Sequence, residues 1–327
     1  MSIMVTGAAG FIGYHLSQAL LARGDRVVGV DSLNAYYDPK LKHARLDRLA
    51  RHDNFTFNQV ELSDRAAMET LGARHTDVTH IVNLAAQAGV RHSLLHPRDY
   101  IQANLSGFLE VLELARHMPK TPNLVYASSS SVYGANTKLP FAVEDAADRP
   151  LALYGATKKA NEAMAYSYAH LYRIPSIGFR FFTVYGPWGR PDMSAYIFTR
   201  AILAGEEITV NNNGDMRRDF TFVDDIVAGL VASLDHPPAP GADGSAPHRV
   251  YNLGNHKSEP LMRFIEILET ACGKKAKIKF APMQDGDVKD TYADIAASTR
   301  DLGFMPRVSI DEGLPRFVDW YKSYHKA

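Results

Sequence analysis

The sequence of 327 residues contains very little cysteine and no excess of charge. Its single cysteine, Cys272, excludes an intramolecular disulfide and a zinc site built from cysteines. The thirteen histidines include no H-E-x-x-H pair, so we expect no metal. Because 36 basic residues balance 36 acidic ones, no bulk field favours nucleic acid or an anionic membrane as a partner.

Long apolar runs are also missing. No run reaches the roughly 18 residues that a membrane-spanning helix needs, and no basic segment leads into an apolar one before residues 3–5. We therefore expect a cytoplasmic protein with no membrane partner. Apolar residues nevertheless make up 46% of the chain, which is typical of a folded globular protein, and its length allows two domains.

Short apolar runs alternate with longer amphipathic segments through the first half of the chain. The runs predict buried strands at residues 2–6, 26–31, 55–60, 79–84, 122–128 and 175–181. The segments between them predict helices near residues 11–23, 40–51, 64–72, 98–117 and 153–172. Repeated strand–helix units build a parallel sheet with helices on both faces. The sequence therefore predicts an α/β fold with a doubly wound parallel Rossmann sheet.

This alternation stops after about residue 182. Short strands follow, mixed with helices expected at residues 195–204, 223–235, 261–272 and 310–325, and a loop rich in Pro and Gly lies near residues 236–247. We expect one domain at residues 1–181 and a smaller C-terminal α/β substrate lobe at residues 182–327, with an interleaved boundary.

The first strand leads into a turn that contains three glycines. The stretch "VTGAAGFIG" places Gly7, Gly10 and Gly13 where a tight turn must let a pyrophosphate approach the backbone and a helix pack against the strand. The start of that helix offers free N–H groups to phosphates. The second strand, "VVGVD", ends in Asp31, whose carboxylate suits ribose hydroxyls and would repel a 2′-phosphate. The sequence therefore predicts an NAD site rather than an NADP site.

Basic residues crowd the helix expected after this strand. They are Lys40, Lys42, Arg45, Arg48 and Arg51. A charge run of this kind is typical of a solvated helix face, so we expect these side chains to be exposed.

A serine-rich strand and a later helix carry a candidate catalytic group. In "YGATKKANE", Tyr154 and Lys158 are four residues apart and therefore on one helix face. A tyrosine with a pKa near 10 needs a shift of about three units, or about 4 kcal/mol, to act as a base at neutral pH. A nearby ammonium and a nicotinamide cation together can supply this shift. The alternative is an ordinary amphipathic helix with a half-buried tyrosine.

These motifs together resemble the extended short-chain dehydrogenase/reductases of the nucleotide-sugar epimerase and dehydratase type, over essentially the whole chain. The resemblance implies that Tyr154 is the base, that Lys158 tunes it and binds the nicotinamide ribose, and that Ser129 in "LVYASSSSVYG" orients the sugar. It also implies an NAD-binding domain and a lobe that binds a UDP-sugar. The implied cofactor contacts are Gly7, Gly10, Phe11, Ile12, Gly13, Asp31, Ser32, Asn34, Glu61, Leu62, Leu84, Ala85, Ala86, Tyr154 and Lys158. At the adenine contact, Glu61 replaces the family's usual aspartate.

Two later segments resemble the family's nucleotide-binding parts. In "NNNGDMRRDFTFVDD", Arg218 matches the residue that meets the UDP diphosphate, and in "QDGDV", Asp287 matches a nucleotide contact. Gln284 stands where UDP-galactose 4-epimerases carry a second phosphate-binding arginine. The alternative for Arg218 is an exposed turn arginine.

The residues before "VYG" distinguish the enzymes that resemble this chain in its N-terminal half but catalyse different reactions. The 4,6-dehydratases carry an Asp-Glu pair there, and UDP-glucuronate decarboxylases a Glu, whereas this chain has Ser130 and Ser131. What remains is 4-epimerisation, in which C4 is oxidised, the ketone turns over and the hydride returns to its other face. The cofactor is regenerated in each cycle and can stay tightly bound.

An aromatic loop with one guanidinium narrows the choice further. The stretches "NAYYDPKLKHARL" and "FFTVYGPWGRPDM" closely resemble the UDP-glucuronate 4-epimerases, in which the matching residues Thr183 and Arg190, with Ser131 nearby, hold the substrate carboxylate. Oxidation at C4 makes a β-keto acid, so an epimerase must keep that carboxylate out of alignment with the ketone, and a charge-assisted fork can do this. The alternative is that Arg190 pairs with a protein carboxylate such as Asp192 or lies in solvent.

The sequence thus predicts an NAD-dependent isomerase that interconverts UDP-glucuronate and UDP-galacturonate. Two alternatives stay open: a UDP-glucose/UDP-galactose 4-epimerase, and a non-catalytic NAD-sensing regulator on the same fold. By analogy with the family, we expect a homodimer formed through the helices near residues 98–117 and 153–172.

Overall fold

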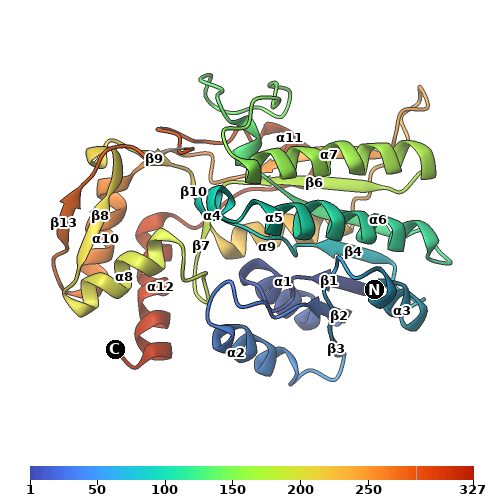
Figure 1. The fold of residues 1–327 in the computed structure, drawn as a ribbon, viewed down its shortest axis with the longest axis horizontal. Helices are drawn as coiled ribbons and strands as arrows, with labels where there is room; N and C mark the ends of the chain where they lie inside the picture. Colours follow the sequence, from blue (N-terminus) through green and yellow to red (C-terminus); the bar gives the residue numbers. More distant parts are fainter. Residues whose placement is uncertain (285) are drawn as a thin grey trace.

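A parallel sheet of seven strands forms the centre of the protein (Figure 1). The computed structural model describes residues 1–284 and 286–327. The strand order is β11-β6-β5-β4-β1-β2-β3, and each neighbouring pair is parallel. The strands are β1 (Ser2–Thr6), β2 (Arg26–Asp31), β3 (Phe55–Gln59), β4 (His80–Asn83), β5 (Asn123–Ser129), β6 (Ser176–Phe181) and β11 (His248–Leu253). This arrangement confirms the predicted Rossmann fold and its six predicted strands.

The seventh strand, β11, was not predicted. It follows the Pro- and Gly-rich loop and returns from the C-terminal part of the chain to pair with β6. The chain therefore crosses into residues 182–247 and comes back to the sheet. The domain boundary at residue 181 stays a prediction.

Both faces of the sheet are covered by helices, which explains why its strands are apolar throughout. Met4 packs into a cluster with side chains of α3 (Arg65–Arg74), α6 (Gly107–His117) and α7 (Leu153–Tyr172). Its neighbours Ile3 and Val5 point the other way, into a cluster with α1 (Phe11–Ala22) and α9 (Val223–Leu234).

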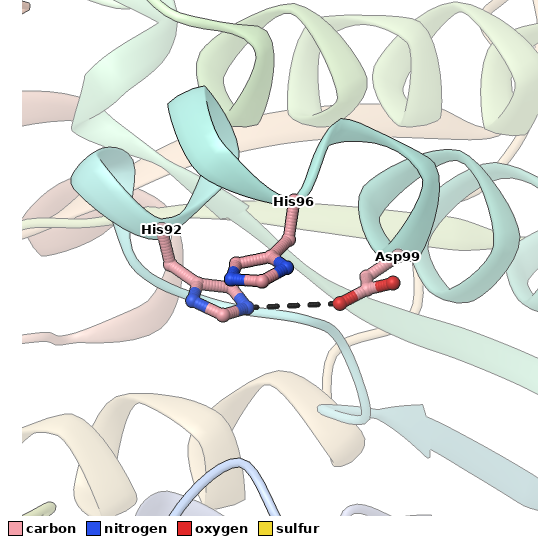
Figure 2. Close-up of side chains that lie close together, drawn as sticks. All are labelled: His92, His96 and Asp99. Carbon is pink, nitrogen blue, oxygen red and sulfur yellow. Dashed lines mark ion pairs between the residues drawn. The ribbon is translucent and has the colours of Figure 1, made fainter.

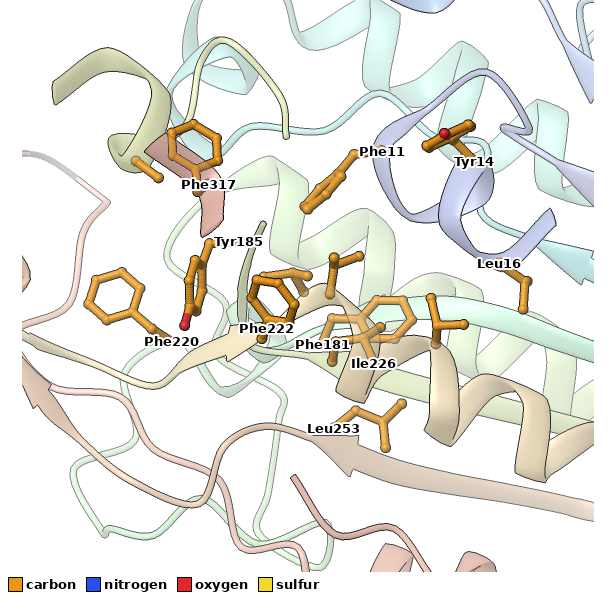
Figure 3. Packing of buried hydrophobic residues seen from close by; sticks show 14 of the residues in the cluster. Phe11, Tyr14, Leu16, Phe181, Tyr185, Phe220, Phe222, Ile226, Leu253 and Phe317 are labelled. Carbon is orange, nitrogen blue, oxygen red and sulfur yellow. The ribbon is translucent and has the colours of Figure 1, made fainter. Parts of the chain in front are cut away.

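This second cluster does not stop at the sheet. Figure 3 shows Phe11 of α1 and Phe181 of β6 in the same packed group as Tyr185, Phe222 and Phe317 of the C-terminal part. One hydrophobic core is therefore shared by the sheet and the C-terminal lobe.

The helix predicted at residues 98–117 is divided into three parts. A short α5 (Pro97–Tyr100) is followed by a π-helical turn (Ile101–Ser106) and then by α6. Asn161 of α7 donates to the carbonyl of Asn104 at 2.6 Å. The Asn104 side chain in turn bonds both backbone groups of Gln87, at 2.8 and 3.0 Å. The irregular turn thus holds the segment that follows β4.

Among the described residues, the part of the chain after β6 forms three two-stranded sheets and several helices. The strand pairs are β7 (Thr183–Tyr185) with β10 (Phe220–Phe222), β9 (Arg217–Arg218) with β12 (Glu259–Pro260), and β8 (Glu207–Val210) with β13 (Lys277–Phe280). The predicted helices are present as α8 (Ser194–Ala204), α9, α10 (Leu261–Cys272) and α12 (Ile310–His325). Of these elements, α8, α10, β8 and β13 lie at the left of Figure 1. Two further helices, α4 (Val90–Leu95) and α11 (Ala296–Leu302), were not predicted. Among the described residues, no helix combines the length and the apolar character that crossing a membrane requires.

The basic helix α2 (Pro39–Leu49) corrects one expectation. Lys40, Arg48 and Arg51 are exposed as expected, but Lys42 and Arg45 are buried. Arg45 donates to the carbonyl of Ala9 at 2.8 Å and to the carbonyl of Trp188 at 2.6 Å, and also to the hydroxyl of Tyr37 at 2.7 Å. These acceptors draw the guanidinium inward, because they lie on the inner side of the helix.

Candidate active site

The glycine turn forms a cradle at the end of β1. Gly7 has a φ of +70°, and a Cβ at Gly13 would overlap the carbonyl oxygen of Gly7, so the turn leaves no room for side chains. No side chain of the described residues caps the start of α1 at Gly10. Its first N–H groups are therefore available to an anion such as a pyrophosphate.

Asp31 is fixed at the end of β2. Its carboxylate accepts from the backbone N–H of Ala9 at 3.2 Å and from that of Leu33 at 2.8 Å. Lys42, which sequence reasoning missed, lies 3.8 Å from this carboxylate and donates to Asn34 at 2.9 Å. Burial lowers the pKa of Lys42, and Asp31 opposes this effect. The carboxylate is thus held in place beside the glycine cradle.

One cavity collects the predicted cofactor contacts at the carboxyl ends of the strands. Glu61 and Leu62 follow β3, residues 84–86 follow β4, and Tyr154 and Lys158 come from α7. The lining includes Gly7, Gly10, Phe11, Ile12, Gly13, Asp31, Ser32, Asn34, Glu61, Leu62, Leu84, Ala85, Ala86, Ser129, Tyr154 and Lys158. The carboxyl ends of parallel strands are where ligands bind in open α/β sheets. The role of each residue stays a prediction.

The electrostatics of Tyr154 differ from the expectation. Burial raises the pKa of Tyr154, while the Ser129 hydroxyl beside it and the Arg190 charge oppose this effect. Lys158 donates to the carbonyl of Ala127 at 2.9 Å, and burial lowers the pKa of Lys158 to about 8. The sequence predicts that Lys158 and the nicotinamide cation together lower the pKa of Tyr154. The protein's own groups leave Tyr154 above its usual pKa.

A second cavity adjoins the first and contains most of the predicted substrate contacts. It shares Tyr36, Arg190 and Met193 with the cofactor cavity. Its lining also includes Thr183, Arg218, Gln284 and Asp287. The side-chain oxygen of Gln284 is buried there without a hydrogen-bond partner from the described residues. Ser131 lies in a smaller cavity that shares Thr183, Arg218 and Asp287 with this one.

Arg218 is held in a fixed orientation at this second cavity. Its Nη2 donates to Asp287 at 2.7 Å, and its Nη1 donates to the carbonyls of Arg217 and Lys289 at 2.9 and 2.8 Å. Arg218 is therefore not the exposed turn arginine that was the alternative.

Arg190 pairs with Asp192, as the alternative reading of the loop allowed. Its Nε and Nη2 donate to the two carboxylate oxygens at 3.0 and 2.5 Å. Tyr36 donates its hydroxyl to the same carboxylate at 3.0 Å. Burial acts to lower the pKa of Arg190, but Asp192 beside it raises that pKa above its usual value. Arg190 still lines both cavities, so pairing does not remove it from the site.

The loop that carries Arg190 is anchored from the cofactor side. His15 of α1 bonds the carbonyl of Pro187 at 2.8 Å, and Arg45 of α2 bonds that of Trp188. Trp188 itself has a φ of +62°. Sequence reasoning missed His15 and Arg45 as loop anchors, because nothing in their local pattern distinguishes them from ordinary helix residues.

A histidine cluster lies beside the substrate cavity (Figure 2). His92 lines that cavity, and all three residues of the cluster line a separate, neighbouring cavity. His92 Nε2 is 3.7 Å from Asp99 Oδ2, and the His92 and His96 rings stack with centroids 4.3 Å apart. Within residues 1–284 and 286–327, this is the group of three whose ligand atoms lie close enough to hold a metal ion. His96 and Asp99 are exposed. The ring of Tyr36 packs edge-on against His92 with centroids 4.8 Å apart.

Comparisons with known proteins cover most of the chain or nearly all of it. The model of the "NAD dependent epimerase/dehydratase family" matches residues 3–254. Protein CapI of Staphylococcus aureus is 49% identical over 336 residues, covering 100% of each chain. UDP-glucuronate 4-epimerase 5 of Arabidopsis thaliana is 44% identical over 337 residues, covering 99% of this chain and 76% of the plant protein. A UDP-glucuronic acid 4-epimerase from Bacillus cereus, crystallised with UDP-glucuronic acid and NAD, is similar with a TM-score of 0.90 and 33% identity, covering 99% and 100% of the two chains.

Proposed function

Because the chain belongs to the NAD dependent epimerase/dehydratase family, we infer that it is an NAD-dependent isomerase that interconverts UDP-glucuronate and UDP-galacturonate. The observation that carries this inference is the position of Arg190, which lines the same cavity as Tyr154. A sugar acid can then present its 4-hydroxyl to the phenol while a guanidinium holds its carboxylate. The Arabidopsis and Bacillus relatives that match the whole chain are UDP-glucuronate 4-epimerases.

The protein uses NAD, and its own residues fit this cofactor. The side-chain-free cradle at Gly7 and Gly13 suits a pyrophosphate, and the positioned Asp31 carboxylate suits ribose hydroxyls. The bound cofactor would supply a hydride acceptor, and later a hydride donor, for C4 of the sugar. We infer that Lys158, which donates to the carbonyl of Ala127 in β5, contacts the nicotinamide ribose.

Side chains of α7 and β5 act on the proton of the sugar's 4-hydroxyl. Tyr154 takes the proton of the 4-hydroxyl, and Ser129 shares a hydrogen bond with the same oxygen. Since burial raises the Tyr154 pKa in the protein alone, the positive charges around it must offset this effect before it can act as a base. Arg190 is one of these charges.

The C-terminal lobe binds the rest of the substrate. Arg218 meets the UDP diphosphate, with Asp287 and Gln284 beside it, and Thr183, Ser131 and Arg190 meet the carboxylate. A charge-assisted hydrogen bond is worth about 1.5–3 kcal/mol. This is enough to keep the acid group out of alignment with the C4 ketone and so to suppress loss of carbon dioxide.

The direct test is the product that purified protein forms from UDP-glucuronate without added NAD, separated by chromatography. We expect UDP-galacturonate, because regenerated cofactor stays bound. Faster turnover of UDP-glucose would favour a neutral-sugar epimerase. No turnover of any UDP-sugar by NAD-loaded protein would favour a non-catalytic NAD sensor.

A homodimer and a cytoplasmic location are part of the proposal. Apolar side chains are exposed on the two helices expected to form the dimer: Leu109 on α6, and Tyr166, Leu171 and Tyr172 on α7. Sedimentation of the purified protein tests this. The cytoplasmic location is supported by the single cysteine, Cys272, which is buried and free.

A further inference from the structure

We propose that Asp192 and Tyr36 are positioning residues that orient the Arg190 guanidinium, so that one of its edges stays turned toward the substrate carboxylate. The proposal rests on the function inferred above. It concerns fidelity, meaning the fraction of substrate that is epimerised rather than decarboxylated.

The hydrogen-bond donors of Arg190 divide into two sets. A guanidinium has five N–H donors in one plane. Asp192 takes two of them, one on Nε and one on Nη2. The remaining donors lie on Nη1 and the outer side of Nη2, and within residues 1–284 and 286–327 they have no protein acceptor. This free edge is the one that can accept a second carboxylate as a fork.

We infer the direction of the free edge from the residues that line the two cavities. Arg190 lines both cavities, whereas Asp192 lines the substrate cavity and, among the described residues, not the one that contains Tyr154. Asp192 therefore holds the guanidinium from the side away from Tyr154.

Tyr36 holds Asp192 in turn. Burial and the Asp192 charge raise the pKa of Tyr36 to about 12, so its hydroxyl stays protonated and can donate to the carboxylate. The Tyr36 ring is packed edge-on against His92, and a Cβ at Gly89 would lie 2.7 Å from the Tyr36 hydroxyl. These contacts leave the phenol little freedom. It joins the segment after β2 to the loop after β7.

The carboxylate of Asp192 also offsets the charge of Arg190 in the absence of substrate. Its removal should strengthen the bare attraction between Arg190 and a uronate. It should also free the guanidinium to turn. If the substrate carboxylate then aligns with the ketone, the C5–C6 bond breaks and carbon dioxide leaves. The bonding pair forms an enolate over C4 and C5, and a solvent proton at C5 completes a UDP-4-ketopentose. The electrons removed from C4 remain on the cofactor.

The test compares Asp192→Asn and Tyr36→Phe with matched variants of a similar group elsewhere. Asp301 accepts from Arg300 Nε and Nη2 at 2.6 and 2.9 Å and from the Tyr251 hydroxyl at 3.1 Å. Asp301→Asn and Tyr251→Phe therefore remove the same kinds of bond without touching the site. Chromatography measures the ratio of pentose to epimer, and nicotinamide absorbance measures the cofactor left reduced.

We expect Asp192→Asn to raise the pentose fraction roughly tenfold, which corresponds to the loss of one charge-assisted hydrogen bond. Tyr36→Phe should raise it less, and the two control variants should leave it unchanged. The KM for UDP-glucuronate should stay the same or fall in Asp192→Asn. If Asp192 and Tyr36 had only a structural role, their replacement would weaken the binding of every UDP-sugar to the same extent.

The outcomes separate this proposal from the proposed function. A wild-type pentose ratio in folded Asp192→Asn and Tyr36→Phe overturns the positioning role, while epimerisation by the wild type keeps the function. If the wild type turns over no uronate, the positioning role is tested by binding instead. The measured quantity is the ratio of the affinity for UDP-glucuronate to the affinity for UDP-glucose, in each variant and in the wild type. A fall of this ratio in Tyr36→Phe, which leaves the charges of Asp192 and Arg190 in place, supports the orientation of Arg190, and an unchanged ratio overturns it.

Discussion

Single side chains in this protein take on roles that depend on where their polar atoms find partners. Arg45 lies within a run of basic residues that resembles a solvated surface, yet it is fully buried. It bonds two carbonyls that belong to different parts of the site, those of Ala9 and Trp188. The local sequence does not reveal this role, because the acceptors come from distant segments.

Replacing Arg45 should therefore be costly. Arg45→Ala leaves buried carbonyls without donors, and we expect the free energy of unfolding to fall by about 3 kcal/mol. Arg51→Ala, on the exposed side of the same basic run, should change it by less than about 0.5 kcal/mol. Urea denaturation of both variants measures the difference. Equal stabilities would contradict the bridging role of Arg45.

Tyr154 is the residue on which turnover should depend most. Tyr154→Phe removes only the hydroxyl, so the fold and NAD binding should be kept. Loss of a positioned acid–base group should reduce kcat by about 10²–10⁴-fold. Steady-state kinetics with UDP-glucuronate provides the measurement, and NAD content after purification provides the control. Full activity in this variant would rule out Tyr154 as the base.

At the scale of elements, the loop after β7 is held by its neighbours as much as by its own sequence. His15 from α1 bonds the carbonyl of Pro187, which is acceptor-only, so the imidazole donates. Burial is the main cause that lowers the pKa of His15, to about 4. The histidine that anchors the loop is therefore neutral at pH 7.

This makes the stability of the protein dependent on pH. Between about pH 6.5 and pH 4, the unfolded chain binds a proton at His15 that the folded chain does not. Stability is thus fully present above pH 6.5 and falls as the pH drops toward 4, by up to about 1.4 kcal/mol per pH unit. Melting temperatures at pH 7 and pH 5 test this. His15→Gln should flatten the dependence relative to wild type, and an unchanged slope would contradict it.

The regular helices and strands could be predicted because the pattern of apolar residues that marks each one lies within its own segment of the sequence. The strand after Pro175 and the helix that carries Tyr154 are examples, and both begin and end close to the predicted residues. The π-helical turn at residues 101–106 could not be predicted, since it depends on Asn161 from another helix. The strand β11 was missed because the alternation of strands and helices had already ended.

At the scale of the whole molecule, the sheet and the C-terminal lobe share one hydrophobic cluster that extends from Val5 to Phe317. The predicted site residues all line cavities at the carboxyl edge of the sheet and the facing lobe, as the parallel topology leads one to expect. The ion pair Arg218–Asp287 could not be predicted in the same way, and the pair Arg190–Asp192 was only an alternative reading of its loop. They depend on the exact path of two irregular loops.

A shared core should make unfolding cooperative across the two predicted domains. We expect calorimetry to show one transition, because neither part buries its apolar face without the other. Two resolved transitions in the NAD-free protein would show that the lobe and the sheet unfold separately.

The tether between α2 and the aromatic loop has a practical consequence for engineering. Grafting residues 186–193 from an enzyme that takes neutral sugars would leave the Arg45 guanidinium facing a backbone that no longer fits it. A graft that keeps the fold would therefore have to replace the loop and helix α2 together.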